Sequence, residues 1–228
     1  MIKAVLIDID DTLLDFKKCA EQSILKSASE INITLPSNIM EIFTRHNDGW
    51  WHRIERGEVT KAQLRQLRFN GIFNEIGVVA DGADFDDRFK RNLGDTCVKI
   101  DGAKELLDYL SRYKLYVASN AHDENYQRGR LTKAGFIHYF DGLFVSGQMG
   151  ANKPTKEFFD RAMSAIGDIS PSEMVMIGDS LTADVSGAKA YGYHTIWFDK
   201  YGVGVGNEAD FVVTKLTDII DIFRSNYE

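Results

Sequence analysis

The stretch that decides the fold is residues 5–12, which read VLIDIDDT. Its apolar first residues predict a buried strand, and the Asp-Asp-Thr that follows predicts a turn. Side chains two positions apart in an extended chain point to the same side, so Asp8 and Asp10 are expected to share one pocket. Two carboxylates in one pocket repel each other unless a cation or a bound proton intervenes. The pair therefore predicts a divalent-metal site with a nucleophile beside an acid; the alternative is a buried strand that simply ends in a polar turn.

Length and charge limit the classes of protein that fit. The chain has 228 residues, enough for one large domain or for a core with an insertion. Its formal net charge is −7, which argues against a nucleic-acid polymer or an anionic membrane surface as partner. No apolar run approaches the roughly 18 residues of a membrane span, and Asp8 interrupts the N-terminal apolar stretch too early for a secretory signal. We therefore expect a cytoplasmic protein.

From residue 101 onward, short apolar segments alternate with amphipathic ones. The pattern predicts strands at 115–118, 143–145, 174–177, 195–198 and 211–213, and helices at 103–112, after Asp123, and at 156–166, 182–191 and 216–223. Such alternation predicts an α/β fold, a Rossmann-like parallel sheet with helices on both faces.

Residues 15–93 break this alternation, because their apolar residues follow the helix period and they contain many charges. We therefore expect a helical cap domain at 15–93, inserted into a catalytic core made of 1–14 and 94–228. The insertion follows the first strand. Open α/β folds bind ligands at the carboxyl edge of the sheet, so a helical insertion at this point can cover the site.

Three further polar clusters follow predicted strands or precede a predicted helix. Ser119 and Asn120 offer a hydroxyl and a backbone N–H to phosphate oxygens. Lys153, followed by a proline, can neutralise a phosphate or an attacking carboxylate. Asp179 and Asp184 can complete an oxygen-rich site for Mg²⁺. Each cluster taken alone is also compatible with an ordinary polar turn.

The order of these clusters resembles the phosphatase branch of the haloacid dehalogenase superfamily. The four motifs that carry the resemblance are Asp8-Ile9-Asp10-Asp11-Thr12, Ser119-Asn120, Lys153-Pro154 and Gly178-Asp179 to Asp184. They span nearly the whole chain and come in the order in which the superfamily has them.

The resemblance implies a role for each core residue. Asp8 is the nucleophile that takes the phosphoryl group as an aspartyl-phosphate. Asp10 is the general acid and then the general base, which requires its pKa to be raised. Ser119 and the N–H of Asn120 hold the phosphate oxygens, and Lys153 balances the charge that develops on them.

The resemblance also implies the cofactor, Mg²⁺. Its ligands are the carboxylate of Asp8, the backbone carbonyl of Asp10 and the carboxylate of Asp179. Asp184 would position metal-bound waters or Lys153.

The presence of Asp10 indicates which branch of the superfamily the chain resembles. Dehalogenases lack an acid two residues after the nucleophile, because a halide leaves without a proton, and phosphonatases typically have Ala there. Asp10 therefore favours phosphate-ester chemistry. Phosphomutases share all four motifs and remain an alternative. Asp11 stands where the family often has Gly, which leaves the geometry of the turn open.

Residues 47–60, followed by Arg68 and Phe69, are similar to the cap of the house-cleaning pyrimidine 5'-nucleotidase subfamily. Caps of that subfamily have an Asn, a Trp four residues later, a Gly-x-Val/Ile-Thr turn and an Arg-Phe pair. On this interpretation an aromatic residue such as Trp51 stacks on a base, while Asn47 or Arg68 binds its polar edge. Alternatively, Trp51 and Phe69 pack in the core of the cap, and Arg68 forms a surface ion pair.

Together these resemblances imply a Mg²⁺-dependent phosphomonoesterase that acts through an aspartyl-phosphate on pyrimidine nucleoside 5'-monophosphates. The expected partner is a small phosphate ester, with no nucleic-acid polymer and no membrane. Three alternatives stay open: a sugar-phosphate phosphatase, a phosphomutase, and a non-catalytic regulatory protein that binds a phosphorylated ligand.

Overall fold

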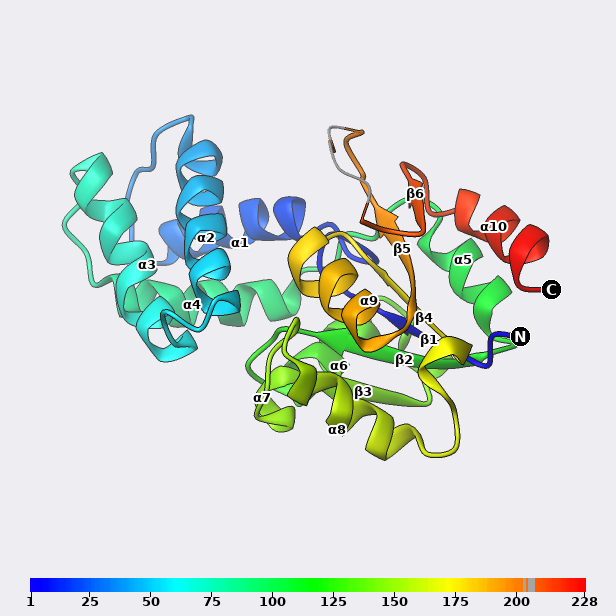
Figure 1. The fold of residues 1–228 in the computed structure, drawn as a ribbon. Coiled ribbons are helices and arrows are strands. Elements are labelled where there is room, and N and C mark those ends of the chain that lie inside the picture. The colour runs from blue at the N-terminus through cyan, green and yellow to red at the C-terminus, as the bar shows by residue number, and fades with distance from the viewer. Residues whose placement is uncertain (203, 205–207) are drawn as a thin grey trace. The chain divides into compact units, whose positions relative to one another are not determined.

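The computed structural model describes residues 1–202, 204 and 208–228. The chain forms two compact units, which are Met1–Asp15 with Lys99–Glu228, and Phe16–Val98. We call them the core and the cap (Figure 1). The predicted boundary between residues 93 and 94 falls within the last turn of helix α4 (Gly82–Asp95), and the cap as observed extends to Val98.

Within the described residues, the core contains a six-stranded parallel sheet with the strand order β3-β2-β1-β4-β5-β6. The strands are β1 (Ala4–Ile7), β2 (Lys114–Ser119), β3 (Gly142–Val145), β4 (Met174–Gly178), β5 (His194–Phe198) and β6 (Phe211–Val213). Strand β1 lies between β2 and β4 and is fully buried, as its continuous apolar sequence predicts. Ile7 pairs with Val117 of β2 and with Ile177 of β4, so the residues after these three strands meet at one edge of the sheet.

Helices cover both faces of this sheet (Figure 1). The α-helices of the core are α5 (Ala103–Leu110), α6 (Glu124–Lys133), α7 (Ser146–Met149), α8 (Lys156–Ile166), α9 (Gly187–Tyr191) and α10 (Asp218–Asn226). Two short 3-10 turns, Ile137–Tyr139 and Pro171–Glu173, precede β3 and β4. The buried side chains of Phe158 and Phe159 on α8 pack with Ala4 and Leu6 of β1 in one hydrophobic cluster. The predicted Rossmann-like α/β class is therefore confirmed.

One predicted helix differs from the observed backbone. The sequence predicts a continuous helix over 182–191, whereas the structure has a π-helical turn, η3 (Leu181–Ser186), followed by α9. Ser180 caps this turn, because its side chain accepts a hydrogen bond from the N–H of Ala183. Wide turns of this kind are frequent at functional sites, and this one contains Asp184.

The cap is helical throughout, and no strand occurs in residues 16–98, all of which the structure describes. Its helices are α1 (Phe16–Glu30), α2 (Ile39–Glu55), α3 (Lys61–Ile76) and α4. Its centre is a group of buried aromatic rings in mutual contact, Phe43, Phe69, Phe73, Phe85 and Phe89. Thr60 and Gln63 form a capping box at the start of α3, and Gly77 ends the helix in the left-handed conformation.

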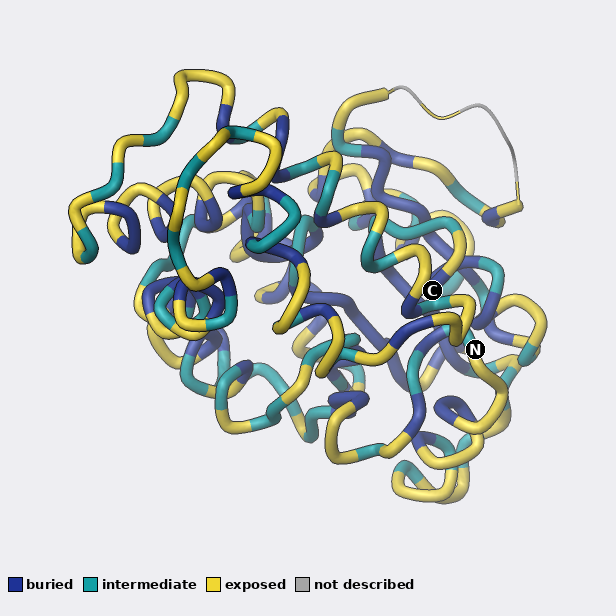
Figure 2. The backbone as a smooth tube through the Cα atoms, turned by 90° about the vertical axis from the view of Figure 1, so that its left-hand side faces the viewer, coloured by how far each residue is buried: buried dark blue, intermediate teal, exposed yellow. Residues whose placement is uncertain are grey.

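The helices of both units show the same pattern of burial (Figure 2). Buried and exposed residues alternate along the helices of both units, because each helix presents only one face to a hydrophobic core. The strands of the core are mostly buried. In the part of the chain that the structure describes, no helix combines the length and the apolar character needed to cross a membrane.

Candidate active site

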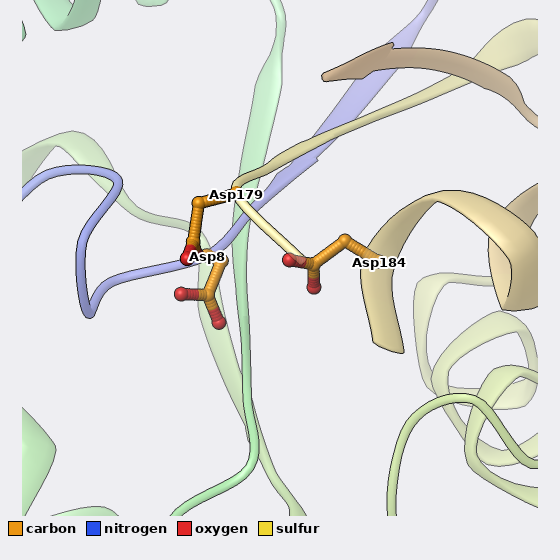
Figure 3. Close-up of side chains that lie close together, drawn as sticks. All are labelled: Asp8, Asp179 and Asp184. Carbon is orange, nitrogen blue, oxygen red and sulfur yellow. The ribbon is translucent and has the colours of Figure 1, made fainter. Parts of the chain in front are cut away.

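Three carboxylates meet at the carboxyl edge of the sheet (Figure 3). Asp8 follows β1, Asp179 follows β4, and Asp184 lies in the π-helical turn η3. One oxygen from each lies within 4.8 Å of the others. Asp8 and Asp184 are buried, and Asp179 is partly buried. The structure therefore brings together three of the four residues predicted to hold a metal.

A buried lysine lies among these carboxylates. Lys153 Nζ is 2.7 Å from Asp8 Oδ1, 2.6 Å from Asp184 Oδ1 and 2.5 Å from the carbonyl oxygen of Ala118. Burial alone would lower the pKa of Lys153, but the charges of Asp184 and Asp8 outweigh burial and raise it. Lys153 therefore carries a fixed positive charge against the predicted nucleophile.

One lysine does not balance three carboxylates. Burial is the main reason that the pKa of Asp8 rises to about 8, and the nearby charges of Asp184 and Asp10 add to the effect while Lys153 opposes it. The pKa of Asp179 is raised well above its usual range, first by burial and then by the charges of Asp8 and Asp184. The cluster therefore has surplus negative charge that a bound cation would relieve.

The donors available fit Mg²⁺, a hard ion that prefers oxygen ligands. Asp8 and Asp179 are the carboxylates best placed to hold it. Both oxygens of Asp184 already have protein partners, because Oδ1 accepts from Lys153 and Oδ2 accepts from the N–H of Ser180 at 3.0 Å. Asp184 therefore fits the role of orienting Lys153.

The predicted phosphate-binding pair follows β2. Ser119 is buried, and its Oγ accepts a hydrogen bond from Gln127 Nε2 at 2.9 Å. The side chain of Asn120 binds the backbone of Lys153 twice, donating to its carbonyl oxygen and accepting from its N–H, both at 2.9 Å. Asn120 therefore fixes the segment that carries Lys153, a function that the sequence pattern did not indicate.

Asp10 lies apart from the three-carboxylate cluster. Its side chain is about one-third exposed, and Oδ1 lies 2.7 Å from Nη1 of Arg130 on α6. Oδ2 accepts a hydrogen bond from Gln127 Nε2 at 3.2 Å. The nucleophile and the predicted acid–base residue therefore have separate polar surroundings, although the charge of Asp10 still contributes to the raised pKa of Asp8.

Sequence reasoning missed three residues that contact the predicted site. Gln127 and Arg130 are buried polar residues on α6 and contact Asp10. The available signal was that helical spacing places them on the same side as the buried Leu131, where apolar residues are usual. Trp197 of β5 donates from Nε1 to the carbonyl oxygen of Asp179 at 2.7 Å. A tryptophan in a predicted strand is expected to be an ordinary core residue, so the sequence did not predict that contact.

Comparison with known proteins agrees with this geometry. The family model for haloacid dehalogenase-like hydrolases matches residues 2–192. The chain belongs to the haloacid dehalogenase-like hydrolase family. The matched range includes strands β1 to β4 and the whole cap.

Two relatives cover almost the same length as this hydrolase. It is 32% identical over 198 residues to the HAD-hydrolase YfnB of Bacillus subtilis, covering 86% of this chain and 84% of that protein. The crystal structure of YfnB bound to magnesium superposes with a TM-score of 0.91 at 30% identity, covering 97% of this chain and 98% of that one. Pyrimidine 5'-nucleotidase PynA of Streptococcus pneumoniae is 30% identical over 228 residues, covering 98% of this chain and 96% of PynA.

A third similarity concerns the fold alone. The structure of L-2-haloacid dehalogenase from Xanthobacter autotrophicus superposes with a TM-score of 0.79 at 19% identity, covering 99% of this chain and 100% of that one. The fold is therefore shared between chemically different hydrolases, and the chemistry must be argued from the site.

The backbone conformation of the turn after β1 bears on Asp11, which stands where the family often has Gly. Asp11 has a φ of 57°, a left-handed conformation that Gly adopts freely and that Asp tolerates better than most residues. Lys200 lies 4.0 Å from the Asp11 carboxylate and 2.9 Å from Asp15. Asp11 thus adopts a conformation that Gly also adopts freely.

The cap residues predicted to bind substrate occupy two clusters. Arg68 and Asn47 are buried and in contact, with 2.8 Å between Arg68 Nη1 and Asn47 Oδ1. Arg68 Nη2 donates to the fully buried Asp86 at 2.6 Å, so Arg68 is an interior residue and not a surface ion-pair partner. Trp51 is partly buried and packs with the cluster that contains Ile54. Binding of substrate by these cap residues stays a prediction.

Proposed function

We propose that this hydrolase is a Mg²⁺-dependent phosphomonoesterase that works through an aspartyl-phosphate on Asp8. The observation that carries the proposal is the separation of two carboxylates with different partners. Asp8 is buried against Lys153 and Asp179, whereas Asp10 is partly exposed and held from α6. A nucleophile and a separate acid–base residue are what phosphate-ester hydrolysis requires. Carbon–halogen cleavage has no use for Asp10, because a halide leaves without a proton.

The first half of the reaction transfers the phosphoryl group to the protein. An oxygen of Asp8 attacks phosphorus, the bond from phosphorus to the ester oxygen breaks, and the departing oxygen takes a proton from Asp10. Ser119 and the N–H of Asn120 bind the non-bridging oxygens, and the ammonium of Lys153 offsets the charge on them. The products are an alcohol and the aspartyl-phosphate.

The second half regenerates the free carboxylate. Asp10, now ionised, takes a proton from a water molecule as the water oxygen attacks the phosphorus of the aspartyl-phosphate. The bond between phosphorus and the Asp8 oxygen breaks, and inorganic phosphate leaves. Asp10 thus ends protonated, as it began.

The proposed metal ligands are the carboxylates of Asp8 and Asp179 and the backbone carbonyl of Asp10, with Asp184 orienting Lys153. When bound, Mg²⁺ neutralises charge on the phosphate and on the carboxylates. Support comes from the surplus negative charge of the cluster and from the magnesium found in the structure of YfnB.

For the substrate, we propose pyrimidine nucleoside 5'-monophosphates. Support comes from the similarity to PynA over 98% of this chain and from the cap stretch around Asn47 and Trp51. On this proposal Asn47, Trp51 and Arg68 contribute to the choice of base.

The test is a phosphate-release screen of the purified protein with Mg²⁺ against nucleoside monophosphates, sugar phosphates and 4-nitrophenyl phosphate. Preference for UMP, dUMP or dTMP supports the whole proposal. Preference for sugar phosphates keeps the chemistry and overturns the substrate class, and transfer to a second sugar hydroxyl in preference to water identifies a mutase. Nucleotide binding without turnover identifies a non-catalytic binder. The Asp8→Asn variant is the control for contaminating phosphatases.

A further inference from the structure

Helix α6 buries two polar side chains against the active site. Gln127 is 0% and Arg130 is 1% exposed. They are three positions apart, so they lie on the same face of the helix. Burial of a guanidinium is costly unless it is paired, and Arg130 is paired with Asp10 at 2.7 Å and with Gln127 Oε1 at 3.0 Å.

Gln127 connects two functional groups of the proposed site. Its Nε2 donates to Ser119 Oγ at 2.9 Å and to Asp10 Oδ2 at 3.2 Å. The carbonyl end of the same amide accepts from Arg130. The Gln127 amide therefore makes three hydrogen bonds within the site, two from Nε2 and one to Oε1, and its position fixes Asp10 relative to Ser119.

Asp10 needs such support because it lies beyond the regular sheet. Strand β1 ends at Ile7, and Asp10 follows in an isolated β-bridge to Leu14, with its side chain about one-third exposed. An acid–base residue must hold its carboxyl group within hydrogen-bond reach of the oxygen that it protonates, and a small displacement is costly to the rate. The bridge to Leu14 holds the backbone of Asp10, and side chains of α6 hold its carboxyl group: Arg130 pairs with Oδ1, and Gln127 donates to Oδ2.

We propose that Arg130 and Gln127 are positioning residues that aim the Asp10 carboxyl group at the leaving-group oxygen and tie it to the phosphate-binding Ser119. This inference rests on the proposed function, because it assigns Asp10 the role of acid and base. It adds a determinant outside the four sequence motifs, on a helix that contributes no reacting group.

The inference predicts a dependence on the leaving group. A nucleoside alkoxide needs a proton to depart, whereas 4-nitrophenolate is a stable anion that leaves without one. If the Asp10 carboxyl group is no longer held near the leaving-group oxygen, phosphoryl transfer from a nucleoside monophosphate should slow much more than phosphoryl transfer from 4-nitrophenyl phosphate. The quantity to compare is kcat/KM, because it reports the first chemical step and excludes hydrolysis of the aspartyl-phosphate.

The experiment compares kcat/KM for UMP and for 4-nitrophenyl phosphate in the wild-type protein and in Arg130→Met. We expect a decrease of about 10- to 100-fold for UMP and of less than about 3-fold for 4-nitrophenyl phosphate. The conservative variant Arg130→Lys, which keeps the charge, should recover part of the loss on UMP. The matched control is Arg128→Met, which removes an exposed arginine of the same helix that pairs with Glu124 at 2.7 Å. It should leave both values unchanged.

Equal losses on the two esters in Arg130→Met, or no loss on either, would overturn the inference while leaving the proposed function standing. If Arg130→Met does not fold, as judged by circular dichroism, the same comparison is made with Arg130→Lys and Gln127→Leu, and an unchanged ratio in both overturns the inference. A wild-type protein that hydrolyses neither ester, nor any other phosphate ester, overturns the proposed function itself and the inference with it.

Discussion

Each unit of the molecule buries a cluster of charged side chains, and the two clusters differ in how their charges balance. In the core, Asp8, Asp179 and Asp184 surround a single cation, Lys153. In the cap, Asp86 pairs with Arg68 at 2.6 Å and with Lys90 at 2.8 Å. The first cluster has surplus negative charge, and the second has none.

We interpret this difference as one between charges that serve the proposed chemistry and ion pairs that stabilise the cap. A buried carboxylate that has cationic partners is compatible with a structural role, since Arg68 and Lys90 compensate the charge of Asp86. The aromatic rings around Arg68 agree with that role, because its guanidinium lies 4.9 Å from the ring centroid of Phe89 and 5.1 Å from that of Phe69. Surplus charge destabilises the fold, so its presence at a sheet edge indicates a function that needs it.

The largest effect expected from breaking the core cluster is on activity. Asp8→Asn removes the nucleophile, and phosphate release should fall at least about a thousandfold. The fold should survive, because the change also removes one of the like charges. Activity is measured by phosphate release and folding by circular dichroism. Residual activity above about one per cent of wild type, after exclusion of contaminants, would contradict the assignment of Asp8.

Breaking the cap cluster should affect stability instead. Asp86→Ala leaves the buried Arg68 without its carboxylate, and we expect the free energy of unfolding to fall by about 3–5 kcal/mol. Urea unfolding followed by circular dichroism measures the change, and the specific activity of the folded fraction should fall far less than in Asp8→Asn.

Two further variants sharpen this prediction. Asp87→Asn alters the neighbouring residue, which forms an exposed pair with Arg65, and it should have a much smaller effect on unfolding. The double variant Arg68→Met with Asp86→Leu removes both charges and should recover much of the lost stability. A large loss of activity in that double variant at normal stability would in addition support the proposed role of Arg68 in substrate binding.

The sequence predicted those helices, strands and site residues that depend on local sequence pattern. The helix at Lys156–Ile166 and the strand at Phe211–Val213 agree with their predicted limits. Apolar runs and helix periods are local properties, and polar residues at the ends of parallel strands meet because the sheet topology brings them there. The approach of Asp8 to Asp179 was predictable for that reason.

The partners of those residues were not predictable from local pattern. Arg130 reaches Asp10, and Arg68 reaches Asp86, only after helices have packed, and nothing in the spacing of either pair marks it. The π-helical turn that carries Asp184 was also missed, because its wider backbone depends on contacts made by Ser180 and not on side-chain periodicity. Tertiary packing decided each of these features.

A smaller effect should follow from adding Mg²⁺, the cation proposed for the core cluster. With Mg²⁺ at about 100 times its dissociation constant, the wild-type protein should gain about 2.7 kcal/mol of stability over the protein in EDTA. Asp179→Asn should lose most of that gain. Asp160→Asn, which changes an exposed carboxylate of α8, should keep it. Thermal unfolding with and without Mg²⁺ measures the difference, and an unchanged midpoint in the wild type would argue against a metal at this cluster.

The smallest expected effect is a pH dependence of stability that comes from Asp8 in the core cluster. Because the pKa of Asp8 is raised to about 8 in the folded protein, the folded state holds a proton that the unfolded chain releases near pH 4. Stability in EDTA should therefore be highest in mildly acidic solution and fall as the pH rises toward 8. Asp8→Asn carries no titrating group at that position, so its stability should fall less over the same interval. The comparison is made by urea unfolding at pH 5.5 and pH 8, with Asp86→Ala as the cap control. Parallel pH profiles for the wild type and Asp8→Asn would show that the surplus charge of the core is relieved by some group other than Asp8.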